Sequence, residues 1–316
     1  MERHPEEVAL RVVGAEGRRP SRAGRHGVLR LRGQLHLLMA LPAFLLFAVF
    51  FLYPLVRSVG LSLTDWSGLG RARFVGLANF GAFFTDARAL GDVKTTVLFA
   101  LGSAPLLNLF GLLYALLLND GFRGRGVARA AVYLPAVISP LIMGYLWYYL
   151  LQPYRGLLAQ ALAGAGVHAT VNWLAHPGSA LAALVLVNVW QYVGMTMIVY
   201  LAGLKSIPPE MYEASRIEGA GRWDTLRFVT LPLLAPALRV NIVTNIIGSL
   251  SVFDVIVSLT DGGPGYATES LSIYILRMVY GSQTGYSTAV ALILFAIILV
   301  PVVISLRLMR RAQYDI

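Results

Sequence analysis

Residues 213–232 read EASRIEGAGRWDTLRFVTLP and lie between two long apolar runs. The wider segment 205–232 carries four basic and four acidic residues, so it is neutral overall. A neutral segment is poorly suited to bind anionic lipid through charge. Its small residues and balanced charge fit docking into a protein cleft, and they fit an amphipathic loop lying on a bilayer about as well.

Helix signals divide this segment into two short helices. Pro208 and Pro209 fit the first turn of a helix that Ser206 or Ile207 would precede, because proline is tolerated there. The apolar residues Met211, Ala214 and Ile217 then recur every third position and predict one stripe. Two glycines permit a sharp turn, and we expect a second short helix over residues 223–229.

The rest of the chain has the composition of a membrane protein. Hydrophobic residues make up 57% and charged residues 13% of the 316 residues, whereas soluble domains carry about a quarter charged residues. A membrane-spanning helix needs about 20 apolar residues to cross roughly 30 Å of hydrocarbon. We therefore predict an all-α, polytopic membrane protein with six transmembrane helices, at about 36–56, 95–118, 127–151, 180–204, 234–258 and 287–307.

The basic residues predict the orientation of these spans. The formal net charge is +10, and eight arginines fall within residues 1–32. Further arginines follow the second and the sixth span, which favours N and C termini in the cytoplasm. Segment 205–232 would then be cytoplasmic too. We expect residues 1–32 to form a disordered basic cytoplasmic tail and residues 33–316 the transmembrane domain, and we expect no nucleic-acid partner.

The sequence argues against several kinds of chemistry. There are no cysteines, which excludes disulfides and thiolate catalysis. The five histidines show no helical spacing with carboxylates, so we expect no metal site and no cofactor. There is no Gly-x-Ser-x-Gly elbow and no Walker motif, so we predict that the chain is not an enzyme and does not hydrolyse ATP.

One multi-position pattern resembles a known family. Glu213-Ala214-Ser215, Gly219 and Leu231-Pro232 are similar to the EAA loop of permease subunits in ABC importers. In that family the loop forms a coupling helix that sits in a groove of a cytoplasmic ATPase. Ser215 replaces the usual second alanine, and Val229 replaces the usual isoleucine. The resemblance implies an ABC type I importer permease fold with a coupling loop at about 206–232. The residues it implies for coupling to the ATPase are Glu210, Met211, Glu213, Ala214, Ser215, Ile217, Gly219 and Ala220.

Two further segments narrow the resemblance. Residues 74–80, FVGLANF, and the motifs Phe253-Asp254, TDGGP at 260–264 and TESL at 268–271 resemble MalF-type permeases of sugar and glycerol-phosphate importers. The likeness covers roughly residues 36–311. Residues 262–265, GGPG, also predict a turn from their composition alone. This turn would either contact a substrate-delivering protein or serve the structure only.

Polar residues in two predicted spans suggest where a substrate passes. Polar groups inside a membrane are costly unless they face the bundle interior or water. Amides, hydroxyls and aromatic rings suit sugars because they bind hydroxyl groups without charge. Each group could instead bind a neighbouring helix. Measured from Glu213, the resemblance implies sugar contacts at Asn188, Gln191, Tyr192, Asn245, Gly248 and Ser249. Asp254 and Arg239 lie near the ends of a span, where they would reach the interface or, for Asp254, stabilise an outer gate.

The function implied is that of a permease subunit in a binding-protein-dependent ABC importer of the cell membrane, which moves a sugar by alternating access. The implied partners are a second homologous permease, two cytoplasmic ATPase subunits, an extracellular substrate-binding protein and membrane lipid. An ion-coupled secondary transporter is the alternative, but it should carry acidic residues in mid-span. A membrane enzyme would need a convergent catalytic set. The sequence leaves the cargo open among disaccharides, monosaccharides, amino sugars and glycerol phosphate.

Overall fold

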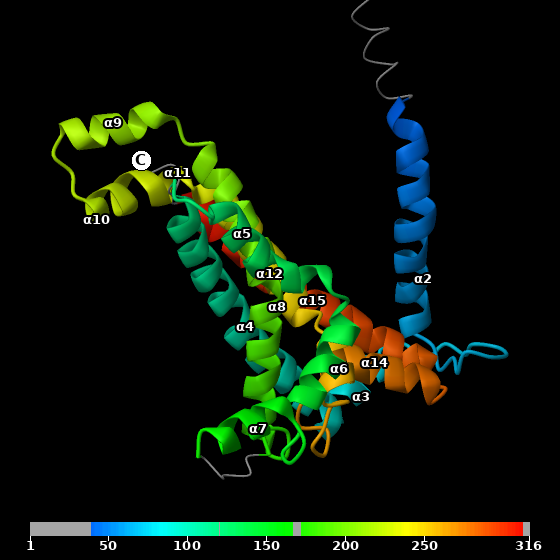
Figure 1. Ribbon diagram of the computed structural model, residues 1–316. Helices are drawn as coiled ribbons and strands as arrows, with labels where there is room; N and C mark the ends of the chain where they lie inside the picture. The colour runs from blue at the N-terminus through cyan, green and yellow to red at the C-terminus, as the bar shows by residue number, and fades with distance from the viewer. Residues whose placement is uncertain (1–38, 120, 167–171, 312–316) are drawn as a thin grey trace, which may run out of the picture. The chain divides into compact units, whose positions relative to one another are not determined.

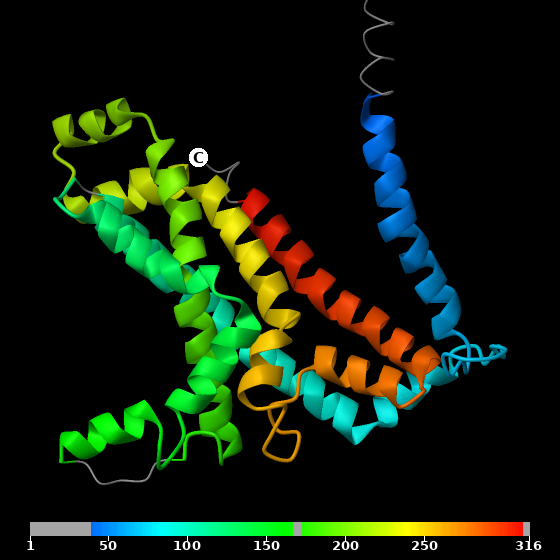
Figure 2. The ribbon, with the colours of Figure 1, turned by 45° about the vertical axis from the view of Figure 1, so that its right-hand side comes forward.

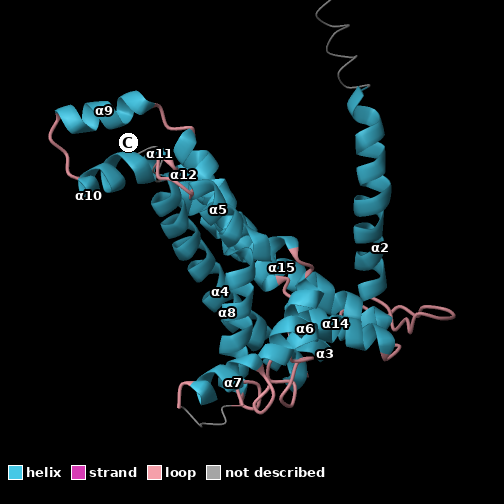
Figure 3. Ribbon diagram, viewed as in Figure 1, coloured by secondary structure: helices cyan, strands magenta, loops and turns pink. Residues whose placement is uncertain are grey.

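The computed structural model describes residues 39–119, 121–166 and 172–311, and these are mostly helical (Figures 1 and 3). The one β contact among them is an isolated antiparallel bridge between Thr64 and Phe74. The all-α prediction is therefore confirmed. The tail predicted at 1–32 lies outside the described residues. The described residues divide into two units, with the boundary between Arg57 and Ser58.

Within the described residues, four helices are long and apolar enough to cross a membrane unbroken: Met39–Ser62, Ala87–Asn119, Pro177–Lys205 and Thr284–Met309. Two helix pairs pass the same criterion but are bent: Arg125–Val137 with Pro140–Leu150 by 97°, and Arg222–Leu233 with Ala235–Leu250 by 70°. Six spans result if each bent pair crosses once. The predicted count agrees with this upper figure, and the span predicted at 127–151 corresponds to the first bent pair, whose bend was not predicted.

The first unit ends within the helix Met39–Ser62, which contains the π-helical turn η1 (Ala48–Leu52) followed by α2 (Tyr53–Ser62). The N–H group of Tyr53 bonds the carbonyl of Ala48, five residues earlier. Pro54 follows directly and has no N–H group to donate. A wider turn ahead of a proline is a common way to accommodate this loss.

The second unit holds the remaining helices. Their bounds are α3 (Ala78–Thr85), α4 (Ala87–Asn119), α5 (Arg125–Tyr133), η2 (Leu134–Val137), α6 (Pro140–Leu150), α7 (Leu157–Gly164), α8 (Pro177–Lys205), α9 (Pro209–Ile217), α10 (Arg222–Asp224), η3 (Thr225–Thr230), α11 (Leu231–Leu233), α12 (Ala235–Leu250), α13 (Asp254–Leu259), α14 (Leu271–Tyr280) and α15 (Thr284–Arg311). Helices α3, α7 and α14 were not predicted as separate helices.

Prolines explain both bends. Ile138 and Ser139 are extended, with ψ of 137° and 134°, because the residue before Pro140 is pushed out of the helical region. Gln191 of α8 donates its side-chain amide to the carbonyl of Ile138 at 3.0 Å, which satisfies a backbone group freed by the break. At the other bend, Pro236 cannot donate to the preceding turn, so the chain changes direction as α12 begins.

The span predicted at 234–258 is interrupted near its C-terminal end, which was not predicted. Helix α12 ends at Leu250, and α13 starts at Asp254 after a break. Ser270, from the far side of a loop, donates to the carbonyl of Val252 at 2.8 Å. This buried bond comes from tertiary structure and supports the broken backbone, so no hydropathy window could have indicated it.

Helix α8 is the centre of the bundle, with 61% of its most apolar 18-residue stretch buried. Two of its neighbours approach closely through glycines. A Cβ at Gly194 would meet the backbone of Val132 and Tyr133 on α5, and a Cβ at Gly111 of α4 would meet Thr196 on α8. Small residues allow this in membrane bundles, where packing replaces the hydrophobic effect as the driving force. On the other flank, α12 and α15 run side by side (Figure 2).

Candidate functional site

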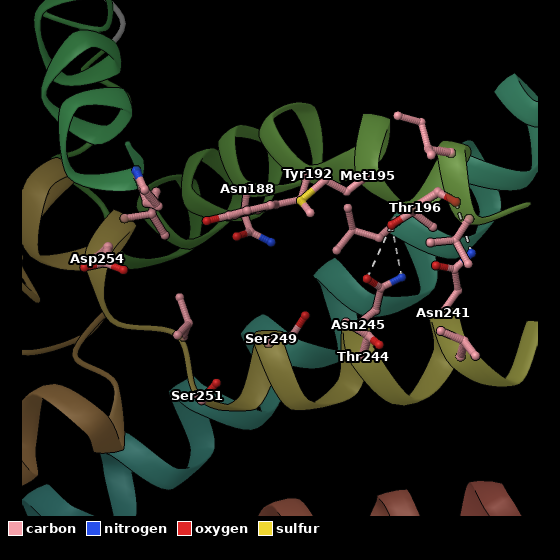
Figure 4. Close-up of a pocket in the computed structure, with 18 of the residues that line it drawn as sticks. Asn188, Tyr192, Met195, Thr196, Asn241, Thr244, Asn245, Ser249, Ser251 and Asp254 are labelled. Atoms are coloured by element: carbon pink, nitrogen blue, oxygen red, sulfur yellow. Dashed lines mark hydrogen bonds between the residues drawn. The ribbon is translucent and has the colours of Figure 1, made fainter. Parts of the chain in front are cut away.

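A partly open cavity of about 520 Å³ lies between α8 and α12 (Figure 4). This volume lies in the range of about 300–1,000 Å³ that small-molecule sites occupy. Polar side chains from both helices project into the space between them. The cavity is lined by Leu107, Tyr133, Pro140, Asn188, Tyr192, Met195, Thr196, Ile198, Val199, Val240, Asn241, Thr244, Asn245, Gly248, Ser249, Ser251, Val252, Phe253, Asp254 and Val255.

Several of the lining polar groups have no partner within the described chain. The hydroxyl of Ser249 is buried and makes no hydrogen bond. Asn188 is only 7% exposed, and its side-chain amide bonds to none of the described residues. The same holds for the hydroxyl group of Thr244. Unpaired polar groups in a membrane protein are costly unless they meet water or a ligand, so these groups mark the surface that faces the cavity contents.

Other lining groups are already paired and build the wall. Thr196 of α8 and Asn245 of α12 exchange hydrogen bonds at 3.4 Å. Asn241 donates to the backbone carbonyl of Thr196 at 3.0 Å. These contacts tie the two helices together at one end of the cavity (Figure 4), so the open space lies toward Asn188 and Ser249.

Five of the six residues that the sequence suggested for substrate contact line this cavity: Asn188, Tyr192, Asn245, Gly248 and Ser249. Gln191 is not among the lining residues. It is fully buried and its amide bonds the carbonyl of Ile138 at the bend before α6. Three further lining residues, Thr196, Tyr133 and Met195, were not predicted from the sequence. Thr196 is a polar residue within an apolar run, and that signal could have found it.

Asp254 is the one formally charged residue among those that line the cavity. It opens α13, directly after the break in the backbone. Its carboxylate accepts no hydrogen bond from the described residues; the bond made at this position goes from the Ser258 hydroxyl to the backbone carbonyl of Asp254, at 2.7 Å. A carboxylate without a hydrogen-bond or ion-pair partner among the described residues therefore lines the cavity.

The segment between α8 and α12 forms a second candidate site. It projects from the bundle as α9, a turn, and the helical stretch Arg222–Leu233 that returns to α12 (Figures 1 and 2). Helix α9 starts at Pro209, slightly later than predicted, because the residue before that proline is held extended. The second short helix predicted at 223–229 is confirmed and is longer than expected.

Two features fix the geometry of this loop. Ser215 is buried and its hydroxyl is 2.8 Å from that of Thr225, so α9 is held against the returning helix. Gly219 has φ of +78°. Its N–H bonds the carbonyl of Arg216 and the N–H of Ala220 bonds the carbonyl of Ser215. This is the Schellman arrangement that ends helices at a left-handed glycine.

Large apolar side chains of the loop face outward. Met211 and Ile217 of α9 are 42% and 87% exposed, and Trp223 and Phe228 of the returning helix are 69% and 67% exposed. The apolar stripe predicted for α9 therefore points away from the bundle, toward whatever covers it. Exposed apolar patches of this kind mark contact with a protein or a membrane.

An ion-pair network lies at the opposite end of the second unit. Glu269 has a fully buried side chain that binds Arg88 twice, at 2.8 and 3.0 Å, and Arg277 at 2.8 Å. The ring of Tyr266 lies over the Arg88 guanidinium at 3.7 Å. The network holds the loop between α13 and α14 against the start of α4, and the turn predicted at 262–265 lies in this loop.

Asp86, which precedes α4, extends this polar end. Burial alone would raise the pKa of its carboxyl group. Hydrogen bonds from the hydroxyls of Tyr274 and Tyr286 and from the backbone N–H groups of Ala89 and Arg88 outweigh burial and hold the pKa below its usual value. The carboxylate is therefore charged at neutral pH and links α3, α14 and α15.

The chain is similar in sequence to known transport proteins. Residues 108–314 match the family described as "binding-protein-dependent transport system inner membrane component". The trehalose/maltose transport system permease protein MalF of Thermococcus litoralis is 34% identical over 274 residues, which cover 86% of this chain and 92% of that protein. The probable starch degradation products permease AmyD of Thermoanaerobacterium thermosulfurigenes is 32% identical over 275 residues, which cover 87% and 93%.

Solved structures are similar as well. One chain of a bacterial ABC transporter that imports the acidic polysaccharide alginate is 28% identical, with a TM-score of 0.77; the match covers 91% of this chain and 99% of that one. A chain of the alginate transporter in complex with its pentasaccharide-bound periplasmic protein is 27% identical, with a TM-score of 0.78. The match covers 89% of this chain and 96% of that one.

Proposed function

The chain belongs to the family of binding-protein-dependent transport system inner membrane components and is a permease subunit of an ABC importer, and we propose that its cargo is a sugar that passes through the cavity between α8 and α12. The observation that carries this proposal is the set of unpaired amide and hydroxyl groups that face the cavity, at Asn188, Thr244 and Ser249. Such groups exchange hydrogen bonds with sugar hydroxyls without needing a charge.

The relatives support a sugar but leave its identity open. The similar proteins are named for the transport of trehalose and maltose, of starch degradation products and of an acidic polysaccharide. The residues proposed to contact the cargo are Asn188, Tyr192, Asn245, Gly248 and Ser249, together with Thr244. Gln191 would act indirectly, by supporting the bend before α6 against which the cavity is built.

The proposed motor is a separate ATPase pair, bound at the projecting loop. Met211 and Ile217 offer an exposed apolar stripe, and the loop as a whole is neutral, which favours a protein groove over an anionic lipid surface. Helix α9 would transmit ATP-driven closure of the ATPases to the bundle, because Ser215 and the Schellman turn hold α9 rigidly against the helix that leads into α12. The cavity would then alternate between inward-facing and outward-facing states.

The proposed assembly also contains a second homologous permease and an extracellular binding protein that delivers the sugar. We place the protein in the cell membrane with both termini in the cytoplasm, as the arginines near the chain ends favour. The network around Glu269 would then lie at the outer face, on the side from which the binding protein delivers its cargo.

A matched pair of serines tests the cavity. Ser249→Ala removes an unpaired hydroxyl, whereas Ser251→Ala removes one that already donates to the carbonyl of Ile247 at 2.7 Å. We expect Ser249→Ala to raise the KM for sugar uptake by about threefold to tenfold, the worth of one net hydrogen bond, and to leave the melting temperature unchanged or higher. Uptake in proteoliposomes of the complete importer measures the KM. The proposal fails if Ser249→Ala transports with the KM of Ser251→Ala.

A further inference from the structure

The residues that line the cavity also bear on the charge of its cargo, which the family membership leaves open. Twenty of the described residues line the cavity, and none of these is a lysine, an arginine or a histidine. Asp254 is the one residue among them that carries a formal charge. Three arginines of the second unit have partners outside the cavity lining. Arg88 and Arg277 bind Glu269, and Arg239 donates to the carbonyl of Met309.

An anionic cargo needs compensation that this cavity does not offer. Carboxylates and phosphates are recognised by arginine forks, lysines or the N-terminal ends of helices. Two helices begin at the cavity lining: α6 begins with Pro140, which has no N–H group to donate, and α13 begins with Asp254, which carries a negative charge of its own. A second negative charge nearby would be repelled, and in a partly desolvated site this repulsion is weakly screened. A neutral or positively charged ligand meets no such penalty.

The Asp254 carboxylate can also bind a ligand directly. Asp254 is half-buried and its carboxylate accepts no hydrogen bond from the described residues, so its oxygens are available to a ligand in the cavity. Hydroxyl groups of a sugar donate to carboxylates in strong, charge-assisted hydrogen bonds. An ammonium group would gain a Coulombic attraction as well.

We propose that the cavity admits uncharged sugars and amino sugars and excludes sugar acids and sugar phosphates, and that Asp254 sets this charge selectivity. This inference rests on the proposed function, because it assigns a cargo class to the same cavity. It separates this chain from the similar structures whose cargo is an acidic polysaccharide, since the lining of this cavity has no group to neutralise a uronate.

A cysteine probe measures the charge selectivity without knowledge of the cargo. The chain has no cysteine, so Ser251→Cys places one thiol in the lining, three residues before Asp254. The complete importer, checked for labelling without this thiol, is treated with the trimethylammonium and the sulfonate ethyl methanethiosulfonates. The labelling rate of the cationic reagent is divided by that of the anionic reagent, and this ratio is divided by the same ratio measured with the free thiol 2-mercaptoethanol. We expect the normalised ratio to favour the cation about tenfold, and Asp254→Asn to bring it near one.

The inference is overturned if the normalised ratio is one or less, or if Asp254→Asn leaves it unchanged. Uptake separates this result from a failure of the proposed function. Cellobiose and cellobiouronic acid differ by one carboxylate, and equal uptake of both would overturn the charge selectivity while leaving sugar transport intact. If the complete importer accumulates none of a panel of sugars, the proposed function fails, whereas the rate ratio still reports the charge of the cavity.

Discussion

Gly219→Val should uncouple ATP hydrolysis from transport. Gly219 has φ of +78° at the end of α9, a conformation that costs a residue with a side chain about 1–2 kcal/mol and a β-branched residue more. The chain would relieve this strain by giving up the Schellman turn, and α9 would lose its fixed direction against the helix that returns to α12. We expect sugar uptake to fall at least about tenfold while ATP hydrolysis by the complex continues.

Gly178→Val is the matched control. Gly178 lies in the first turn of α8, it is exposed, and a Cβ there meets nothing within 4 Å. The control should therefore keep both uptake and hydrolysis near the original rates. Uptake and phosphate release are measured on the same proteoliposomes, and the ratio of sugar moved to ATP hydrolysed is compared. Unchanged coupling in Gly219→Val would sink the idea that α9 transmits the motion.

Glu269→Gln should cause the largest loss of stability. The side chain of Glu269 is fully buried and binds two arginines, Arg88 and Arg277. Removing one member of a buried ion pair costs about 3–5 kcal/mol, because the remaining charge loses its partner; here Arg88 loses its carboxylate, whereas Arg277 keeps its contact with Asp261. The two arginines are 31% and 26% exposed and regain some hydration, so we expect a loss near the lower limit, about 3 kcal/mol.

Asp261→Asn is the control for this network. Asp261 also binds Arg277, at 3.0 Å, but its side chain is 78% exposed. Exposed pairs contribute about 0–1 kcal/mol, so this variant should unfold almost like the original protein. Thermal unfolding of the purified protein in detergent compares the two. Equal melting temperatures for Glu269→Gln and Asp261→Asn would contradict the structural role of the network.

Hydropathy predicted where apolar helices lie but could not predict how they bend. The α4, α8 and α15 spans were expected from their long uncharged runs, because the cost of polar groups in lipid makes such runs distinctive. The 97° bend near Pro140 was missed, since proline also occurs in straight transmembrane helices. The break at 251–253 depends on a bond from Ser270, and such a long-range contact leaves no local pattern in the sequence.

The candidate sites were predictable to different degrees. Asn188 and Asn245 stand out as amides in apolar runs, and both line the cavity. Gln191 stands out in the same way, yet it faces the bend before α6, because neighbouring faces of one helix cannot be told apart without knowing the packing. The pairing of Arg88 with Glu269 joins residues 181 positions apart, and their sequences carry no sign of it.

The most direct test of the central claim is uptake by the complete importer in proteoliposomes. The importer is assembled from this chain with its partner permease, ATPase subunits and binding protein. We predict that a labelled neutral sugar accumulates only when ATP reaches the ATPase subunits and the binding protein is present on the opposite face. Accumulation that needs neither ATP nor the binding protein, driven instead by a proton or sodium gradient, would contradict the account and favour an ion-coupled transporter.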